Sequence, residues 1–112
     1  MTPHAQTTMM IDREVRRYTQ DLARWSQQVR AAHSDVEAFR LASHRPVPAA
    51  LIRSLGTLWS RERHRAEADI ERSLSGRIEK LGAGDPGLPM LMRLAQGHWP
   101  RLYQRLETLR RG

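Results

Sequence analysis

The chain has 112 residues, which is enough for one ordinary domain and too few for two. It contains no cysteine, which excludes disulfide bonds and thiolate metal sites and is typical of a reducing compartment. No segment has the length and apolar character of a signal peptide or a membrane span. We therefore expect a soluble, cytoplasmic protein with no membrane span.

The net charge of +7 suggests an acidic partner such as nucleic acid. The charge is spread along the chain, however, because seven basic and five acidic residues lie in 1–45, seven and five in 46–82, and five and two in 83–112. Of the 19 basic residues, Lys80 is the one lysine and the others are arginine. This spread is more typical of solvated helix faces than of a dedicated phosphate-binding face.

The first predicted element is a long helix over residues 8–43. Thr7 or Thr8 can cap its start, and Pro46 and Pro48 end it because proline removes a backbone donor and disfavours the α conformation before it. Apolar side chains recur along it at alternating steps of four and three, the a/d spacing of a helix that packs lengthwise on another helix. These residues are Ile11, Val15, Tyr18, Leu22, Trp25, Val29, Ala32, Val36 and Phe39.

Two further helices are predicted over residues 48–81 and 86–111. Pro48 suits the first turn of the second helix, Gly82 suits a left-handed cap after it, and Pro100 should kink or split the third. The apolar positions of the second helix are Ile52, Leu55, Trp59, Ala66, Ile70, Leu74, Ile78 and Leu81. Those of the third are Leu88, Leu91, Ala95, Trp99, Leu102, Leu106 and Leu109.

These elements predict a single all-α domain over the whole chain. Its expected form is a long antiparallel helical hairpin with a shorter, proline-kinked third helix, a coiled-coil-like three-helix bundle. If the chain reverses near Pro46, bulky residues meet small ones across the seam. Trp25 then faces Ala66, and Ala32 faces Trp59, which is how helical layers interdigitate at native density.

The third helix is expected to be too short to cover the far tip of the hairpin. An exposed apolar tip usually marks a site of self-association or partner binding. We therefore expect a homo-oligomer or a protein partner bound through Val36, Phe39, Leu51, Ile52, Leu55 and Leu58. The alternative is that the third helix bends at Pro100 and covers more of the hairpin.

No catalytic, cofactor or metal site is predicted, and we expect no enzyme activity. The five histidines form no i, i+4 pair. His64, Glu67 and Glu71 share one helical face, but carboxylate metal sites in helical bundles need ligands from several helices. No glycine-rich loop follows a strand, so a nucleotide loop is not expected either.

The alternative function is a basic accessory protein that binds nucleic acid, since arginines contact phosphates. The residues that would do so are Arg61, Arg63 and Arg65 in the second helix and Arg101, Arg105, Arg110 and Arg111 near the C-terminus. A helix-turn-helix is not visible, because a turn at Gly56 would put Glu62 and Arg65 at positions that need apolar packing.

One stretch of the second helix opens with Pro48 and carries Leu51, Leu55, Leu58 and Trp59, followed by Ala66 and Ala68. In these residues it resembles the segment that follows the DNA-binding domain in KfrA-type plasmid proteins. It covers residues 46–74 and implies a helical multimerisation segment opened by a proline. The glycine-rich DNA-binding half of that family has no counterpart here, so the resemblance does not extend to DNA binding.

The favoured interpretation is a non-catalytic helical assembly or adaptor protein that acts through protein–protein contacts and self-association. A nucleic-acid-binding accessory protein of the plasmid-maintenance type is the alternative. A small chaperone for a secreted partner would share the same fold and is a further alternative.

Overall fold

The computed structural model describes residues 3–112, in which every regular element is a helix, and the all-α prediction is confirmed. The side chains of residues 3–7 and of Leu58 lie outside the described part. The helices are α1 (Pro3–Arg30), α2 (Asp35–Ala42), α3 (Ala50–Arg53), α4 (Gly56–Ile78), α5 (Leu88–Ala95) and α6 (Pro100–Arg111).

The predicted helix over residues 8–43 is broken, since α1 ends at Arg30 and the chain reverses before α2 begins. Ser34 is the N-cap of α2, and its Oγ accepts a hydrogen bond of 3.1 Å from the backbone N–H of Glu37. The Glu37 carboxylate accepts one of 3.3 Å from the backbone N–H of His33. These bonds satisfy donors that an unbroken helix would use internally, so they stabilise a new helix start.

Arg77 of α4 also stabilises the reversal between α1 and α2. Its guanidinium donates to the carbonyl oxygen of Ala32 at 2.7 Å and to that of Arg30 at 3.4 Å. It also pairs with the Asp35 carboxylate at 3.1 Å. A cation at the carboxyl end of α1 complements the helix dipole and satisfies carbonyl groups that lack partners within the helix.

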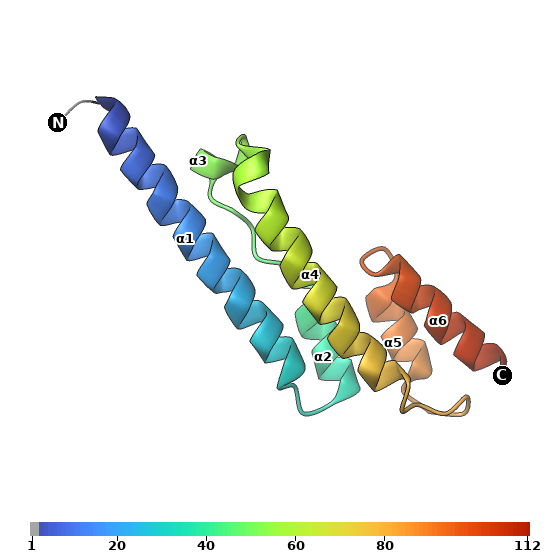
Figure 1. Cartoon of the computed structure of the whole chain (residues 1–112). Helices are drawn as coiled ribbons and strands as arrows, with labels where there is room; N and C mark the ends of the chain where they lie inside the picture. The colour runs from blue at the N-terminus through green and yellow to red at the C-terminus, as the bar shows by residue number, and fades with distance from the viewer. Residues whose placement is uncertain (1–2) are drawn as a thin grey trace.

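The predicted antiparallel hairpin is wrong, because α1 and α4 run in the same direction (Figure 1). The ring of Tyr18 meets that of Trp59 edge to face at 6.0 Å, while Ala32 lies beside Arg77 and not beside Trp59. Residue numbers therefore rise together along both helices. Two reversals separate them, one between α1 and α2 and one between α3 and α4, so the direction of α1 is restored in α4.

The predicted helix over residues 48–81 is shorter than expected. Residues 45–49 form an irregular linker, α3 is a single turn, and α4 starts only at Gly56. The two prolines of the linker keep it extended. Pro48 is buried and the carbonyl of Pro46 accepts a long hydrogen bond of 3.5 Å from Tyr18 Oη, so the linker packs along α1.

The predicted helix over residues 86–111 is split at the site expected from Pro100. α5 ends at Ala95, Gly97 adopts a left-handed conformation with φ of 79°, and Pro100 is the first residue of α6. Proline suits this position because the first helical N–H has no partner within the helix. α5 packs on α2, where Ser43 Oγ donates to the carbonyl of Leu94 at 3.2 Å.

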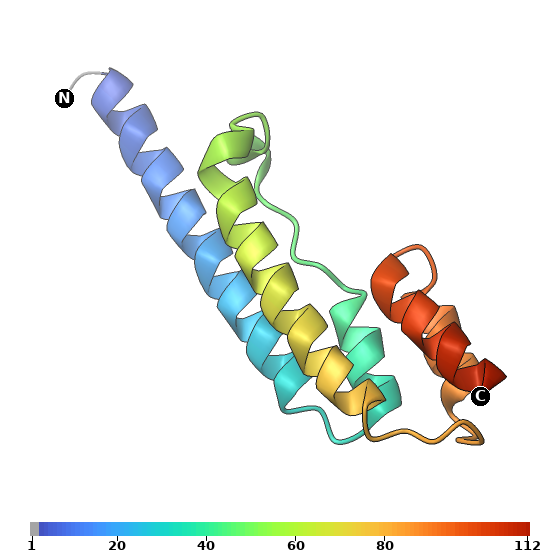
Figure 2. The ribbon, with the colours of Figure 1, turned by 45° about the vertical axis from the view of Figure 1, so that its right-hand side comes forward.

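The molecule is elongated, with extents of 64 × 23 × 17 Å and a radius of gyration of 17.4 Å. A compact chain of this length would have a radius of gyration of roughly 13 Å. α2 lies between α1, α4 and α5, and its Phe39 is completely buried in the core. α1 extends beyond the start of α4 at one end of the molecule, and α5 and α6 lie toward the other end (Figures 1 and 2).

Candidate functional site

The structure separates the residues that were expected at an exposed hairpin tip. Phe39 and Ile52 are fully buried and Val36 is half-buried against the core, so these three do not form an exposed tip. The break after Arg30 explains the difference, because it turns α2 back into the centre of the bundle. Leu51 and Leu55 are exposed as expected, and the side chain of Leu58 lies outside the described part.

Exposed apolar side chains nevertheless gather at one end of the molecule, which we call the apolar end. It consists of Met9 and Met10 on α1 and of Leu51 and Leu55 around α3, with exposed fractions of 59%, 55%, 39% and 36%. These four residues stay exposed because α1 projects beyond the other helices here and α3 has only four residues (Figures 1 and 2). Val47 is also exposed, but it lies in the linker beside Arg24 and Trp25 of α1 and is not part of this end.

A second feature lies along α4, where Glu67 pairs with two arginines. Its carboxylate lies 3.6 Å from Nε of Arg45, which comes from the linker. The Arg45 guanidinium lies 4.4 Å from the centre of the Trp99 ring and donates to the carbonyl of His98 at 2.9 Å. These contacts join the linker, α4 and the α5–α6 loop, so Arg45 has a structural role that sequence reasoning missed.

The same carboxylate lies 3.1 Å from Nε of Arg63, whose guanidinium lies 4.8 Å from the centre of the Trp59 ring. A cation over a tryptophan face is attracted by the ring quadrupole. Arg63, which was predicted to contact phosphate, is therefore engaged within the protein. Burial raises the pKa of the neighbouring Tyr18 hydroxyl, Arg63 lowers it and Glu67 raises it.

The arginines proposed for nucleic acid do not form one surface. Besides Arg63, three of them lie near carboxylates: Arg65 near Glu62 at 4.0 Å, Arg105 near Glu79 at 3.9 Å and Arg111 near Glu107 at 2.5 Å. In the described part of the chain, Arg61, Arg101 and Arg110 have no ion pair. Arg61, Arg63 and Arg65 lie in the first half of α4, whereas α6, which carries the other four arginines, lies beside the last turns of α4 (Figure 1).

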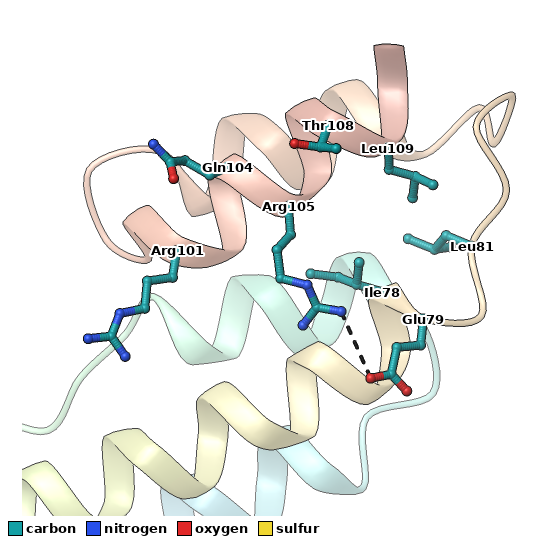
Figure 3. A pocket seen from close by; sticks show the side chains of 8 residues that line it. All are labelled: Ile78, Glu79, Leu81, Arg101, Gln104, Arg105, Thr108 and Leu109. Atoms are coloured by element: carbon teal, nitrogen blue, oxygen red, sulfur yellow. Dashed lines mark ion pairs between the residues drawn. The ribbon is translucent and has the colours of Figure 1, made fainter. Parts of the chain in front are cut away.

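A groove of about 550 Å³ lies between the end of α4 and α6 (Figure 3). Arg101 and Arg105 extend from α6 toward α4, and the side chains of Leu81 and Leu109 approach each other at the far end of the groove. Ile78 lies between Arg105 and the two leucines, and it is buried. The remaining lining residues are Glu79, Gln104 and Thr108. The groove therefore combines cations on one wall with an apolar floor.

Among the side chains that the structure describes, no group of three or more potential metal ligands is brought together. His64, Glu67 and Glu71 share the helix α4, but Glu67 is occupied by Arg45 and Arg63.

Over residues 3–112, no helix combines the length and apolar character that crossing a bilayer requires.

Comparison of the chain with known protein families, with curated proteins and with solved structures finds no match. The surface features that bear on function are the apolar end and the groove between α4 and α6.

Proposed function

We propose that this chain is a non-catalytic helical assembly protein that self-associates through its apolar end and serves as an adaptor. The observation that carries the proposal is the exposure of Met9 and Met10 of α1 together with Leu51 and Leu55 at the same end. Exposed apolar side chains gathered in one region typically mark a protein–protein contact. The implication of the KfrA-type resemblance, a helical multimerisation segment over residues 46–74, agrees with this assignment.

Charge sets the conditions under which the contact should form. Each copy carries a net charge of +7, so two copies repel each other at low ionic strength. Salt screens this repulsion and does not weaken apolar burial. Self-association should therefore strengthen as salt is added, whereas binding to nucleic acid would weaken.

Leu51→Glu tests the proposal because it places a charge on an exposed apolar residue of the apolar end. Met90→Glu is the matched control, since Met90 is exposed to a similar degree as Leu51 and lies on α5, away from the apolar end. Sedimentation of the wild type should show a dimer or larger species at raised salt. Leu51→Glu should increase the dissociation constant about tenfold, with no effect of Met90→Glu.

Two outcomes would contradict self-association at the apolar end. One is a wild-type chain that remains monomeric over the whole concentration and salt range. The other is an equal effect of Leu51→Glu and Met90→Glu on the dissociation constant while circular dichroism shows both variants folded.

The exposed, unpaired guanidinium groups of Arg61, Arg101 and Arg110 favour a second candidate function, binding of nucleic acid through phosphate contacts. Titration with duplex DNA at increasing salt distinguishes the two. A steep loss of affinity with salt would support this candidate, and the absence of any complex at low salt would dismiss it.

A further inference from the structure

The groove between α4 and α6 is lined by two arginines from the same face of α6. Arg101 and Arg105 are four residues apart on α6 and therefore lie on one face of that helix, and both are exposed. Arg101 has no ion pair within the described residues, and the only one of Arg105 is with Glu79 at 3.9 Å. Both guanidinium groups are thus available to an external anion (Figure 3).

The other part of the groove is apolar. Leu81 and Leu109 are half-buried and approach each other across it, and Ile78 forms its floor (Figure 3). A ligand that fills the groove gains binding free energy from both parts only if it carries negative charge near the arginines and apolar groups near the leucines. The groove therefore selects an amphipathic anion.

The shape of the groove favours a helix over the other candidates. Residues 101–109 of α6 span about 12 Å, which is two turns, and the groove is open along one side, whereas small-molecule sites enclose most of their ligand. Nucleic acid presents phosphates without apolar side chains. A second copy carries the same charge of +7 and would be repelled, while an acidic protein would be attracted.

We propose that the groove between α4 and α6 binds an acidic amphipathic helix of a partner protein. Two carboxylates spaced by four residues on that helix pair with Arg101 and Arg105, and its leucine-like side chains contact Leu81 and Leu109. This is the helix-in-groove mode of recognition, in which residues of one helical face serve as anchors. The site lies away from the apolar end, so it does not depend on self-association.

The test uses the full chain and a synthetic helical peptide of about 15 residues, the length at which isolated helices begin to form. The peptide carries two glutamates at i, i+4 and leucines on the adjoining face, and a second peptide carries lysines in place of the glutamates. Fluorescence anisotropy should show binding of the glutamate peptide only. Arg101→Glu and Arg105→Glu should each weaken it about tenfold.

Three further variants serve as controls. Arg61→Glu changes the net charge equally on an exposed arginine of α4 outside the groove, and it should alter affinity less than about twofold. Leu109→Gln should weaken binding because it removes an apolar contact. Leu51→Glu should leave peptide affinity unchanged, which distinguishes failure here from failure of self-association.

The proposal is overturned if the glutamate peptide does not bind to folded wild-type protein. It is also overturned if Arg61→Glu weakens binding as much as Arg101→Glu, or if Leu109→Gln has no effect. Tighter binding of duplex DNA that displaces the peptide and is lost in Arg101→Glu would assign the groove to nucleic acid instead.

Discussion

Tyr18 shows how a single residue couples the core of the bundle to its charged surface. Its ring is 97% buried against Trp59, and its hydroxyl lies near the ion pair between Arg63 and Glu67. Burial raises the pKa of this hydroxyl above its ordinary value of about 10. The native state therefore keeps the Tyr18 proton at a pH where the unfolded chain has lost it.

This difference predicts a pH dependence of stability. Because the pKa is raised in the folded state, the stabilisation is fully present below pH 10 and is lost as pH rises from about 10 through the folded pKa. In urea unfolding, the free energy of unfolding should therefore fall with pH over this range, and the slope from this one group is at most about 1.4 kcal/mol per pH unit. Tyr18→Phe should remove that slope. An unchanged slope in Tyr18→Phe, or its loss in the matched variant Tyr103→Phe, would contradict the assignment.

Single residues of the candidate sites were predictable only in part. Leu51 and Leu55 stand out as apolar residues near a proline-rich linker, and they are exposed as expected. Phe39 follows the same apolar stripe and is fully buried, because burial depends on the direction of α2 and not on the pattern alone. Arg101 and Arg105 were identified as cations, but the leucines that complete their groove come from contacts between distant helices.

At the scale of elements, the reversal between α1 and α2 decides the topology. The apolar stripe continues in phase through Ala32, Val36 and Phe39, which is why the sequence suggests one uninterrupted helix. The local signal for a break is Ser34 followed by Glu37, a capping box that can open a new helix. With α2 folded back, the same stripe still faces the core. Hydrophobic periodicity alone therefore does not distinguish one unbroken helix from two helices separated by a reversal.

Arg77 connects α4 to this reversal, and Arg77→Met should destabilise the fold. The substitution retains an apolar side chain of similar length but removes the ion pair with Asp35 and the bonds to the carbonyls of Arg30 and Ala32. Loss of charged hydrogen bonds in a half-buried position should lower the free energy of unfolding by roughly 2–4 kcal/mol. Urea denaturation measures the change.

The control for this prediction is Arg72→Met. Arg72 is exposed on the same helix and, within the described part of the chain, pairs only with Asp69, one turn away, so its removal should cost less than about 0.5 kcal/mol. Equal destabilisation by the two variants would show that Arg77 does not stabilise the turn between α1 and α2.

Helix boundaries were predictable where proline or glycine acts locally. Pro100 predicts the split between α5 and α6, and the prolines of the linker predict the end of regular structure there. The parallel direction of α1 and α4 was not predictable, because it follows from two reversals whose positions depend on capping and on long-range contacts such as those of Arg77. The position of one reversal therefore decides the direction in which two helices pass each other.

At the scale of the whole molecule, the two proposed sites lie toward opposite ends of a chain 64 Å long. The apolar end would join copies, and the groove between α4 and α6 would hold an acidic helix. Because α1 projects at one end and α6 lies toward the other, both sites can be occupied at once (Figures 1 and 2). This arrangement suits an adaptor that clusters its partners through its own assembly.

The absence of cysteine allows the assembly contact to be tested directly. A single Leu51→Cys substitution places a unique thiol on the apolar end, and Met90→Cys places one on α5 as the matched control. At raised salt, a short thiol-reactive cross-linker should join Leu51→Cys copies into dimers and leave Met90→Cys copies monomeric. Equal cross-linking of the two variants, or none at Leu51→Cys, would contradict assembly through the apolar end.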